Sequence, residues 1–137
     1  MAGILVVDEH KDMMGLYADV FSNSSYKMFK CYKPKEAKKL VTGNYRNLVS
    51  LIIADSYISE INVYEMIRQI YRANEKIKFI LHPAPPEKAV KIKKKVKPKD
   101  EVKSQLDELV SKGAEIRYLP TMFKKEDLLE LVKSMIG

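Results

Sequence analysis

Three carboxylates stand where two apolar segments of the chain end. Asp8 and Glu9 follow the apolar run of residues 4–7, and Asp55 follows the run of residues 48–54. Converging carboxylates repel one another and need a cation, and oxygen ligands completed by water suit Mg²⁺. A carboxylate beside Mg²⁺ can accept a phosphoryl group, because the metal neutralises the oxygens that gain charge. Single acids often follow strands merely as solvated caps, but a pair after one run and a third after another favour an acidic site.

The two runs are expected to be strands of one parallel sheet. Five short apolar segments alternate with five segments of helical periodicity. The expected strands are residues 4–7, 26–32, 48–54, 77–81 and 116–119, and the expected helices are residues 11–22, 34–43, 63–71, 102–110 and 128–135. This alternation predicts an α/β fold, a doubly wound five-stranded parallel sheet with helices on both faces. In such sheets ligands bind beyond the carboxyl ends of the strands. Asp8, Glu9 and Asp55 can therefore meet there, with His82 and Thr121 after the last two strands.

Length and composition exclude several other classes of protein. The 137 residues suit one domain spanning residues 1–137. No apolar run approaches the roughly 20 residues of a membrane span, and no basic leader precedes the first apolar run. The single Cys31 fits a reducing compartment, so a cytoplasmic location is expected. Asp8 and His10 fit the start of an Asp-x-His-x-x-Gly cobalamin motif, but Met13 stands at the glycine position and excludes it.

Four stretches give the chain a family resemblance. They are Ile-Leu-Val-Val-Asp-Glu at residues 4–9, Leu-Ile-Ile-Ala-Asp at 51–55, Gly-Ala-Glu-Ile-Arg-Tyr-Leu at 113–119, and Phe123 before the last helix. In order and spacing they resemble the receiver domain of two-component response regulators (CheY-like). The resemblance covers essentially the whole chain and implies a flavodoxin-like (βα)5 fold. It also implies a signalling module rather than an enzyme, beyond its own phosphorylation and dephosphorylation.

The resemblance assigns roles to the strand-end residues. Asp55 would be the phosphoacceptor, and Asp8 and Glu9 would hold Mg²⁺, one directly and one through water. Tyr57 would offer its backbone carbonyl to the metal, and Tyr118 would be the switch aromatic that moves inward on activation. The implied partners are a histidine kinase or phosphotransfer protein and a downstream protein.

The chain departs from the family pattern at two positions. His82 stands where receivers place a Thr or Ser hydroxyl that bonds the phosphoryl oxygen, and Thr121 stands where they place a lysine. Loss of one fixed cation costs about 2–4 kcal/mol of transition-state stabilisation, by analogy with lost oxyanion donors. A protonated His82 could compensate, as could Lys124 or Lys125 after a rearrangement of the loop.

A lysine-rich segment separates the fourth strand from the following helix. Thirty residues lie between His82 and Gly113, more than in a typical receiver, so a basic insertion is expected at about residues 85–99. Seven lysines and no acid lie between Lys88 and Lys99, a charge equal to the net charge of +7. The segment fits an extended arm or a helix between Pro86 and Pro98. It is either a solvated loop or a contact for nucleic acid, an acidic protein or an anionic membrane.

Two functions compete on these residues. The first is a stand-alone receiver that accepts a phosphoryl group at Asp55 with Mg²⁺ and acts through protein–protein contact. The second is a pseudo-receiver, a binding module without phosphoryl switching, with nucleic acid or an acidic protein as candidate partners of Lys88–Lys99. The acidic residues favour the first, and the missing lysine and hydroxyl favour the second.

Overall fold

The structure, a computed structural model, describes residues 2–59, 61–84 and 106–137. Five parallel strands form one sheet in the order β2-β1-β3-β4-β5. The strands are β1 (Gly3–Val7), β2 (Lys27–Cys31), β3 (Val49–Asp55), β4 (Lys78–His82) and β5 (Ile116–Tyr118). The predicted doubly wound parallel sheet is therefore confirmed, including the contact between the first and third strands.

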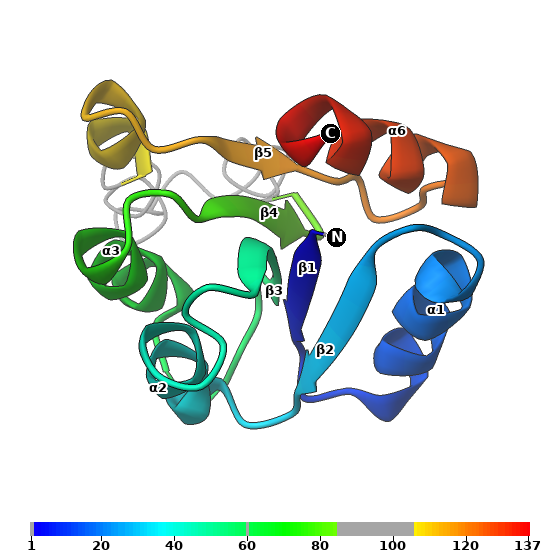
Figure 1. The fold of residues 1–137 in the computed structure, drawn as a ribbon, viewed down its shortest axis with the longest axis horizontal. Helices are drawn as coiled ribbons and strands as arrows, with labels where there is room; N and C mark the ends of the chain where they lie inside the picture. The colour runs from blue at the N-terminus through cyan, green and yellow to red at the C-terminus, as the bar shows by residue number, and fades with distance from the viewer. Residues whose placement is uncertain (1, 60, 85–105) are drawn as a thin grey trace, which may run out of the picture.

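Helices cover both faces of the sheet, and their bounds agree closely with the apolar periodicity. They are α1 (Lys11–Ser22), η1 (Pro34–Glu36), α2 (Ala37–Thr42), α3 (Val63–Ala73) and α6 (Lys125–Ile136), and residues 106–111 are also helical. Figure 1 shows α1 and α6 on one side of the sheet and α2 and α3 on the other. The predicted second helix begins as a 3-10 turn, because Pro34 fixes the first φ and offers no amide hydrogen.

Each face of the sheet has its own apolar core. Because side chains alternate along a strand, Ile4 and Val6 pack on the α1 and α6 side, whereas Leu5 and Val7 pack on the α2 and α3 side. All four are fully buried. This explains why the strands read as continuous apolar runs rather than as alternating ones.

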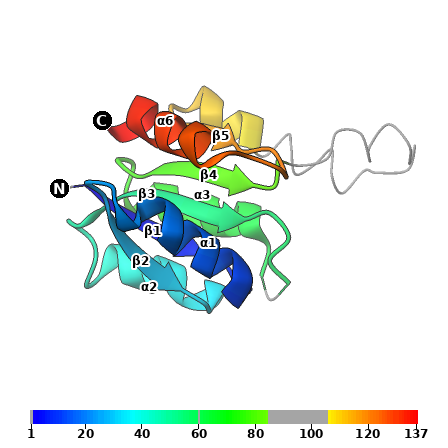
Figure 2. The ribbon, with the colours of Figure 1, turned by 90° about the vertical axis from the view of Figure 1, so that its right-hand side faces the viewer.

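The carboxyl ends of all five strands point to one edge of the molecule (Figure 2). That edge carries the loops after β1, β3, β4 and β5, so the fold brings the predicted site residues to one side. The predicted basic insertion, with Lys88–Lys99, lies outside the described residues. No helix in the described part of the chain is long and apolar enough to cross a bilayer.

Candidate functional site

The sheet register places three buried polar side chains on one face at the carboxyl edge. Asp55 is the register partner of His82, and Asp8 directly follows Val7, the last residue of β1. Two-residue alternation puts Asp8, Asp55 and His82 on the face covered by α1 and α6. They are the buried polar residues of the described chain, with relative exposures of 3%, 7% and 7%.

Asp8, His10 and Asp55 form a compact cluster. Asp8 Oδ1 accepts hydrogen bonds from the backbone N–H of His10 at 2.8 Å and pairs with His10 Nδ1 at 3.0 Å. The same Nδ1 lies 3.5 Å from Asp55 Oδ2. One ligand atom from each of the three residues lies within 4.8 Å of the others. These three residues, with one nitrogen and two oxygen donors, could hold a small cation.

The two carboxylates are only half satisfied. Asp55 Oδ1 accepts a hydrogen bond from the backbone N–H of Tyr57 at 2.9 Å. Within the described residues, no hydrogen bond reaches Oδ2 of Asp8 or Oδ2 of Asp55. Neither oxygen is a fully buried unpaired atom, and Asp55 Oδ2 faces His10 Nδ1 at 3.5 Å, so both oxygens can accept a cation or a newly bonded group.

The surroundings of the cluster raise the pKa of both the Asp55 carboxyl group and the His10 imidazole. Burial raises the pKa of Asp55, and the nearby Asp8 carboxylate adds to this rise, against the hydrogen bond from Tyr57. The hydrogen bond and charge of Asp8 raise the pKa of His10. The pKa of Asp55 is thus raised mainly by burial and that of His10 mainly by its contact with Asp8, and the negative charge of Asp8 contributes to both shifts.

Glu9 turns away from this cluster. Its carboxylate accepts hydrogen bonds from the backbone N–H of Ser59 at 2.9 Å and from the Ser59 hydroxyl at 3.1 and 3.2 Å. Glu9 therefore ties the end of β1 to the loop between β3 and α3. The structure brings Asp8 and Asp55 together as the sequence predicts, whereas the third member of the cluster is His10.

Tyr17 on α1 lies beneath the cluster. Its side chain is almost completely buried, and its ring lies 6.2 Å from the His82 ring and 6.3 Å from the Phe123 ring. Burial and the negative charges of Asp8 and Asp55 raise the pKa of Tyr17. Helical side chains lean toward the helix N-terminus, which for α1 is the edge that carries the carboxylates. Tyr17 thus contributes a buried hydroxyl near both acids that sequence reasoning did not identify.

His82 is held at the other side of this group. Its Nε2 lies 3.2 Å from the backbone carbonyl oxygen of Thr121, and its ring packs edge-on against Phe123 at 5.0 Å. The imidazole therefore links the end of β4 to the loop before α6. Thr121 itself is exposed, and neither Lys124 nor Lys125 pairs with an acid of the cluster in the described structure.

The two tyrosines with predicted roles lie on the surface. Tyr57 is 54% exposed and Tyr118 is 40% exposed. Both lie near Tyr64 of α3, whose pKa is raised to about 12 by burial, Tyr118 and Tyr57. The three phenol rings thus share one surface region beside the acid cluster. The switch role of Tyr118 and the metal contact of the Tyr57 carbonyl stay predictions.

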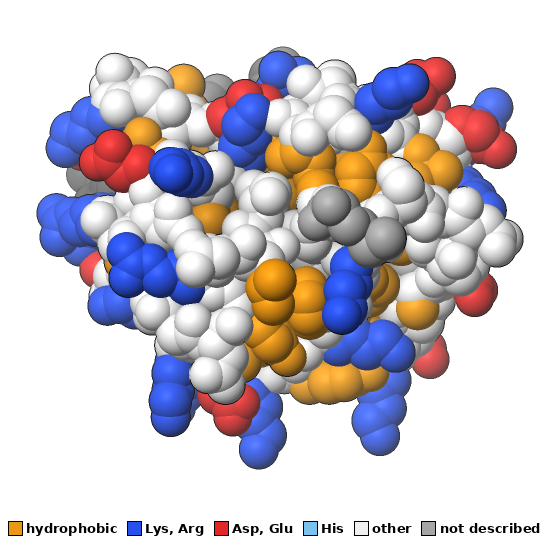
Figure 3. Space-filling view, in the orientation of Figure 1, with side chains coloured by type: hydrophobic (Ala, Val, Ile, Leu, Met, Phe, Trp, Pro, Cys, Tyr) orange, Lys and Arg blue, Asp and Glu red, His pale blue; other side chains and the backbone are white. Residues whose placement is uncertain are grey.

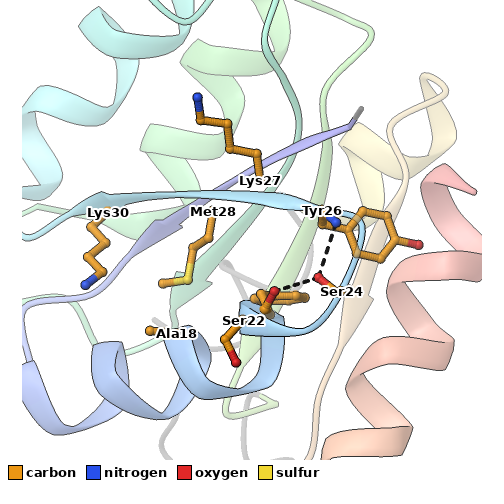
Figure 4. Close-up of a pocket in the computed structure, with 8 residues that line it drawn as sticks. Ala18, Ser22, Ser24, Tyr26, Lys27, Met28 and Lys30 are labelled. Carbon is orange, nitrogen blue, oxygen red and sulfur yellow. Dashed lines mark hydrogen bonds between the residues drawn. The ribbon is translucent and has the colours of Figure 1, made fainter.

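The pocket between α1 and β2 lies apart from these residues. Its lining, drawn in Figure 4, includes Ser22, Ser24, Met28 and Lys30. Both serine hydroxyls donate to backbone carbonyls of α1, so they are already satisfied. None of the acid-cluster residues lines this pocket.

Solved structures with the same fold are numerous, although no protein-family model and no curated protein matches the chain. The chemotaxis protein CheY4 of Vibrio cholerae is 18% identical, with a TM-score of 0.70 and 99% of both chains covered. A response regulator signal receiver domain of Bermanella marisrubri is 18% identical, with a TM-score of 0.71 and both chains covered completely. The signal receiver domain of an HD domain-containing protein of Pseudomonas fluorescens is 16% identical, with a TM-score of 0.74, and 98% of this chain and 86% of that chain are covered. The resemblance predicted from sequence is thus confirmed for the fold, which is that of CheY-like receiver domains.

Proposed function

We propose that the chain is a receiver module that accepts a phosphoryl group at Asp55 in the cytoplasm. The donor is a histidine kinase or phosphotransfer protein, and the output is contact with a downstream protein. One observation carries the proposal. Two carboxylates, each more than nine-tenths buried, stand side by side at the carboxyl edge of a receiver fold, and each keeps one oxygen without a hydrogen bond.

The donor set fits a divalent cation. Asp8 and Asp55 would hold Mg²⁺, and the backbone carbonyl of Tyr57 and a water held by Glu9 would complete the oxygen ligands. When bound, the metal supplies positive charge that neutralises the phosphoryl oxygens. The remaining steps belong to residues of the chain.

The Tyr57 N–H donates to Oδ1 and so orients the carboxylate of Asp55, which supports its role as the nucleophile. One carboxylate oxygen forms a bond to phosphorus, the bond between phosphorus and the donor breaks, and the donor atom keeps the electron pair and takes up a proton. Burial of Asp55 keeps water from the new acyl phosphate and raises the pKa of the carboxyl group, which makes the carboxylate more basic.

The proposal is tested by intact mass. The protein is incubated with Mg²⁺ and acetyl phosphate, and the gain of one phosphoryl group is measured for wild type, Asp55→Asn and Asp12→Asn. Asp12 is an exposed acid in the first turn of α1 and serves as the matched control. We expect the adduct on wild type and Asp12→Asn alone. Equal labelling of Asp55→Asn would exclude Asp55 as the acceptor.

A binding module without phosphoryl switching is the second candidate, and a basic surface favours it. Residues 27–46 contain seven Lys and Arg against one acid, Glu36. The charge outside Lys88–Lys99 sums to zero but is thus unevenly spread. All seven cations are exposed, and none takes part in an ion pair within the described chain. In Figure 3, blue side chains project over α2 and β2.

This candidate has its own readout. Retention on immobilised DNA that falls steeply with salt, together with no adduct from acetyl phosphate or a kinase, would favour the binding module. Retention unchanged by Lys→Gln substitutions in residues 27–46 would exclude this surface.

A further inference from the structure

His10 does not act as the cap of the helix that it precedes. It is the N-cap residue of α1, yet its side chain forms no capping hydrogen bond. Asp8 accepts the hydrogen bond of the His10 backbone amide instead, and this contact fixes the turn between β1 and α1. The imidazole is therefore directed at the two carboxylates rather than at the helix.

The distances from His10 Nδ1 to the two carboxylates are compatible with ligands on one metal ion. Ligands about 2.1 Å from a metal and at right angles to each other lie about 3.0 Å apart. His10 Nδ1 lies 3.0 Å from Asp8 Oδ1 and 3.5 Å from Asp55 Oδ2. The two carboxylate side chains are each more than nine-tenths buried and converge on His10 Nδ1, so a donor set of two carboxylates and one imidazole fits a divalent cation.

We propose that His10 is a third protein ligand of the divalent cation, and that its nitrogen makes the site prefer Mn²⁺ or Co²⁺ over Mg²⁺. The inference rests on the metal site of the proposed function and deepens it. Carboxylate and water ligands suit Mg²⁺, whereas an imidazole ligand favours first-row transition metals. The Nδ1 atom binds the metal through its lone pair, in the neutral tautomer that carries the proton on Nε2.

Access to the site agrees with this role. The His10 side chain is 66% exposed, while those of Asp8 and Asp55 are 5% and 8% exposed. A cation thus enters from the imidazole side and is held by the acids beneath. The other histidine of the chain, His82, is engaged with the carbonyl of Thr121 and provides an internal reference.

The test measures binding of the metals alone, at one pH of about 8, where an ordinary imidazole is neutral. Dissociation constants for Mn²⁺, Co²⁺ and Mg²⁺ are determined for wild type, His10→Ala, Asp8→Asn and Asp12→Asn. We expect His10→Ala to weaken Mn²⁺ and Co²⁺ binding by about 10- to 100-fold, the range seen when the surroundings of a bound metal are altered. Mg²⁺ binding should change much less. Asp8→Asn should weaken all three, and Asp12→Asn none.

A measurement on wild type alone does not depend on whether the His10→Ala variant folds correctly. Zn²⁺ is added to ¹⁵N-histidine-labelled protein, and the ring nitrogens of the two histidines are followed by NMR. We expect a large shift of His10 Nδ1 and little change at His82.

The outcomes separate this inference from the proposed function. A ratio of Mn²⁺ to Mg²⁺ affinity that is the same in wild type and His10→Ala, or an unshifted His10 Nδ1 on saturation with Zn²⁺, overturns the role of His10 and leaves the phosphoryl acceptor intact. A failure of wild type to bind any of the metals overturns both the ligand set and the metal of the proposed function. Phosphoryl uptake at Asp55 is decided independently by intact mass.

Discussion

Replacing Asp55 by Asn should stabilise the protein when no divalent cation is present. Asp55 and Asp8 are both buried, and their ligand atoms lie within 4.8 Å of each other. Two like charges at that distance repel by about 3 kcal/mol at an effective dielectric constant of about 20. Asn removes this repulsion and the cost of burying a charge, while its carbonyl oxygen can still accept the hydrogen bond from Tyr57. We therefore expect the free energy of unfolding to rise by about 1–3 kcal/mol.

The sign of the pH dependence follows from the pKa of Asp55, which is raised in the folded protein. The folded state then binds a proton more readily than the unfolded state, so wild type loses stability as the pH rises through the folded pKa. His10 acts in the same direction, because its pKa is also raised and the charge that pairs with Asp8 is lost at high pH. The advantage of Asp55→Asn is therefore largest at alkaline pH and shrinks as the pH falls.

Urea unfolding at about pH 8.5, with EDTA present, measures the difference directly. Asp107→Asn is the control, because Asp107 is an exposed acid on the helical segment 106–111. Saturating Mn²⁺ or Mg²⁺ should remove this difference in the free energy of unfolding, because it stabilises wild type alone. If Asp55→Asn were as stable as wild type or less stable at this pH, the two buried carboxylates would not be in repulsive contact and the basis of the cation site would be lost.

Two further substitutions test the elements that carry the site. Asn62→Ala should lower the free energy of unfolding, measured in urea, by about 1 kcal/mol, because the Asn62 side chain accepts hydrogen bonds from the backbone amides of two residues in the first turn of α3. Asn62→Asp should retain most of the stability, and equal losses in the two variants would refute the capping role. Gly3→Ala should cost about 2–4 kcal/mol in thermal unfolding, because a Cβ on Gly3 would lie 2.1 Å from the carbonyl oxygen of Leu48; a loss below about 0.5 kcal/mol would mean that the start of β1 moves freely.

The topology of the sheet was readable from the sequence because both of its faces are buried. The resulting apolar runs are long and continuous, so β1 and β3 lie within one residue of their expected bounds. The short helix α2 was harder to delimit, because Pro34 starts it as a separate 3-10 turn. Edge strand β2 was also less distinct, since two exposed lysines flank two half-buried residues there and break the apolar run.

The identity of the third cluster residue was the main feature that sequence reasoning missed. The acids Asp8, Glu9 and Asp55 were expected to converge, but adjacent residues of an extended chain point to opposite sides, and the metal contact of Glu9 through water stays a prediction. Asp8 and His10 are two residues apart and therefore share a side, while Glu9 reaches Ser59 in the loop after β3. The signal was present in the spacing, which placed His10 beside Asp8 and left Glu9 on the other side.

His82 shows why a position alone does not determine a role. The sequence placed it at the end of the fourth strand, where the resemblance expects a small hydroxyl, and the register pairs it with Asp55. An imidazole is larger and has apolar faces, and Tyr17 and Phe123 offer it an aromatic environment on the α1 and α6 side. The ring packs there and its Nε2 reaches the Thr121 carbonyl, so His82 joins β4 to the loop that in receivers carries the lysine. Thr121 is exposed in that loop, so under the proposed function the positive charge that the described residues offer near Asp55 lies on the side of Asp8 and His10.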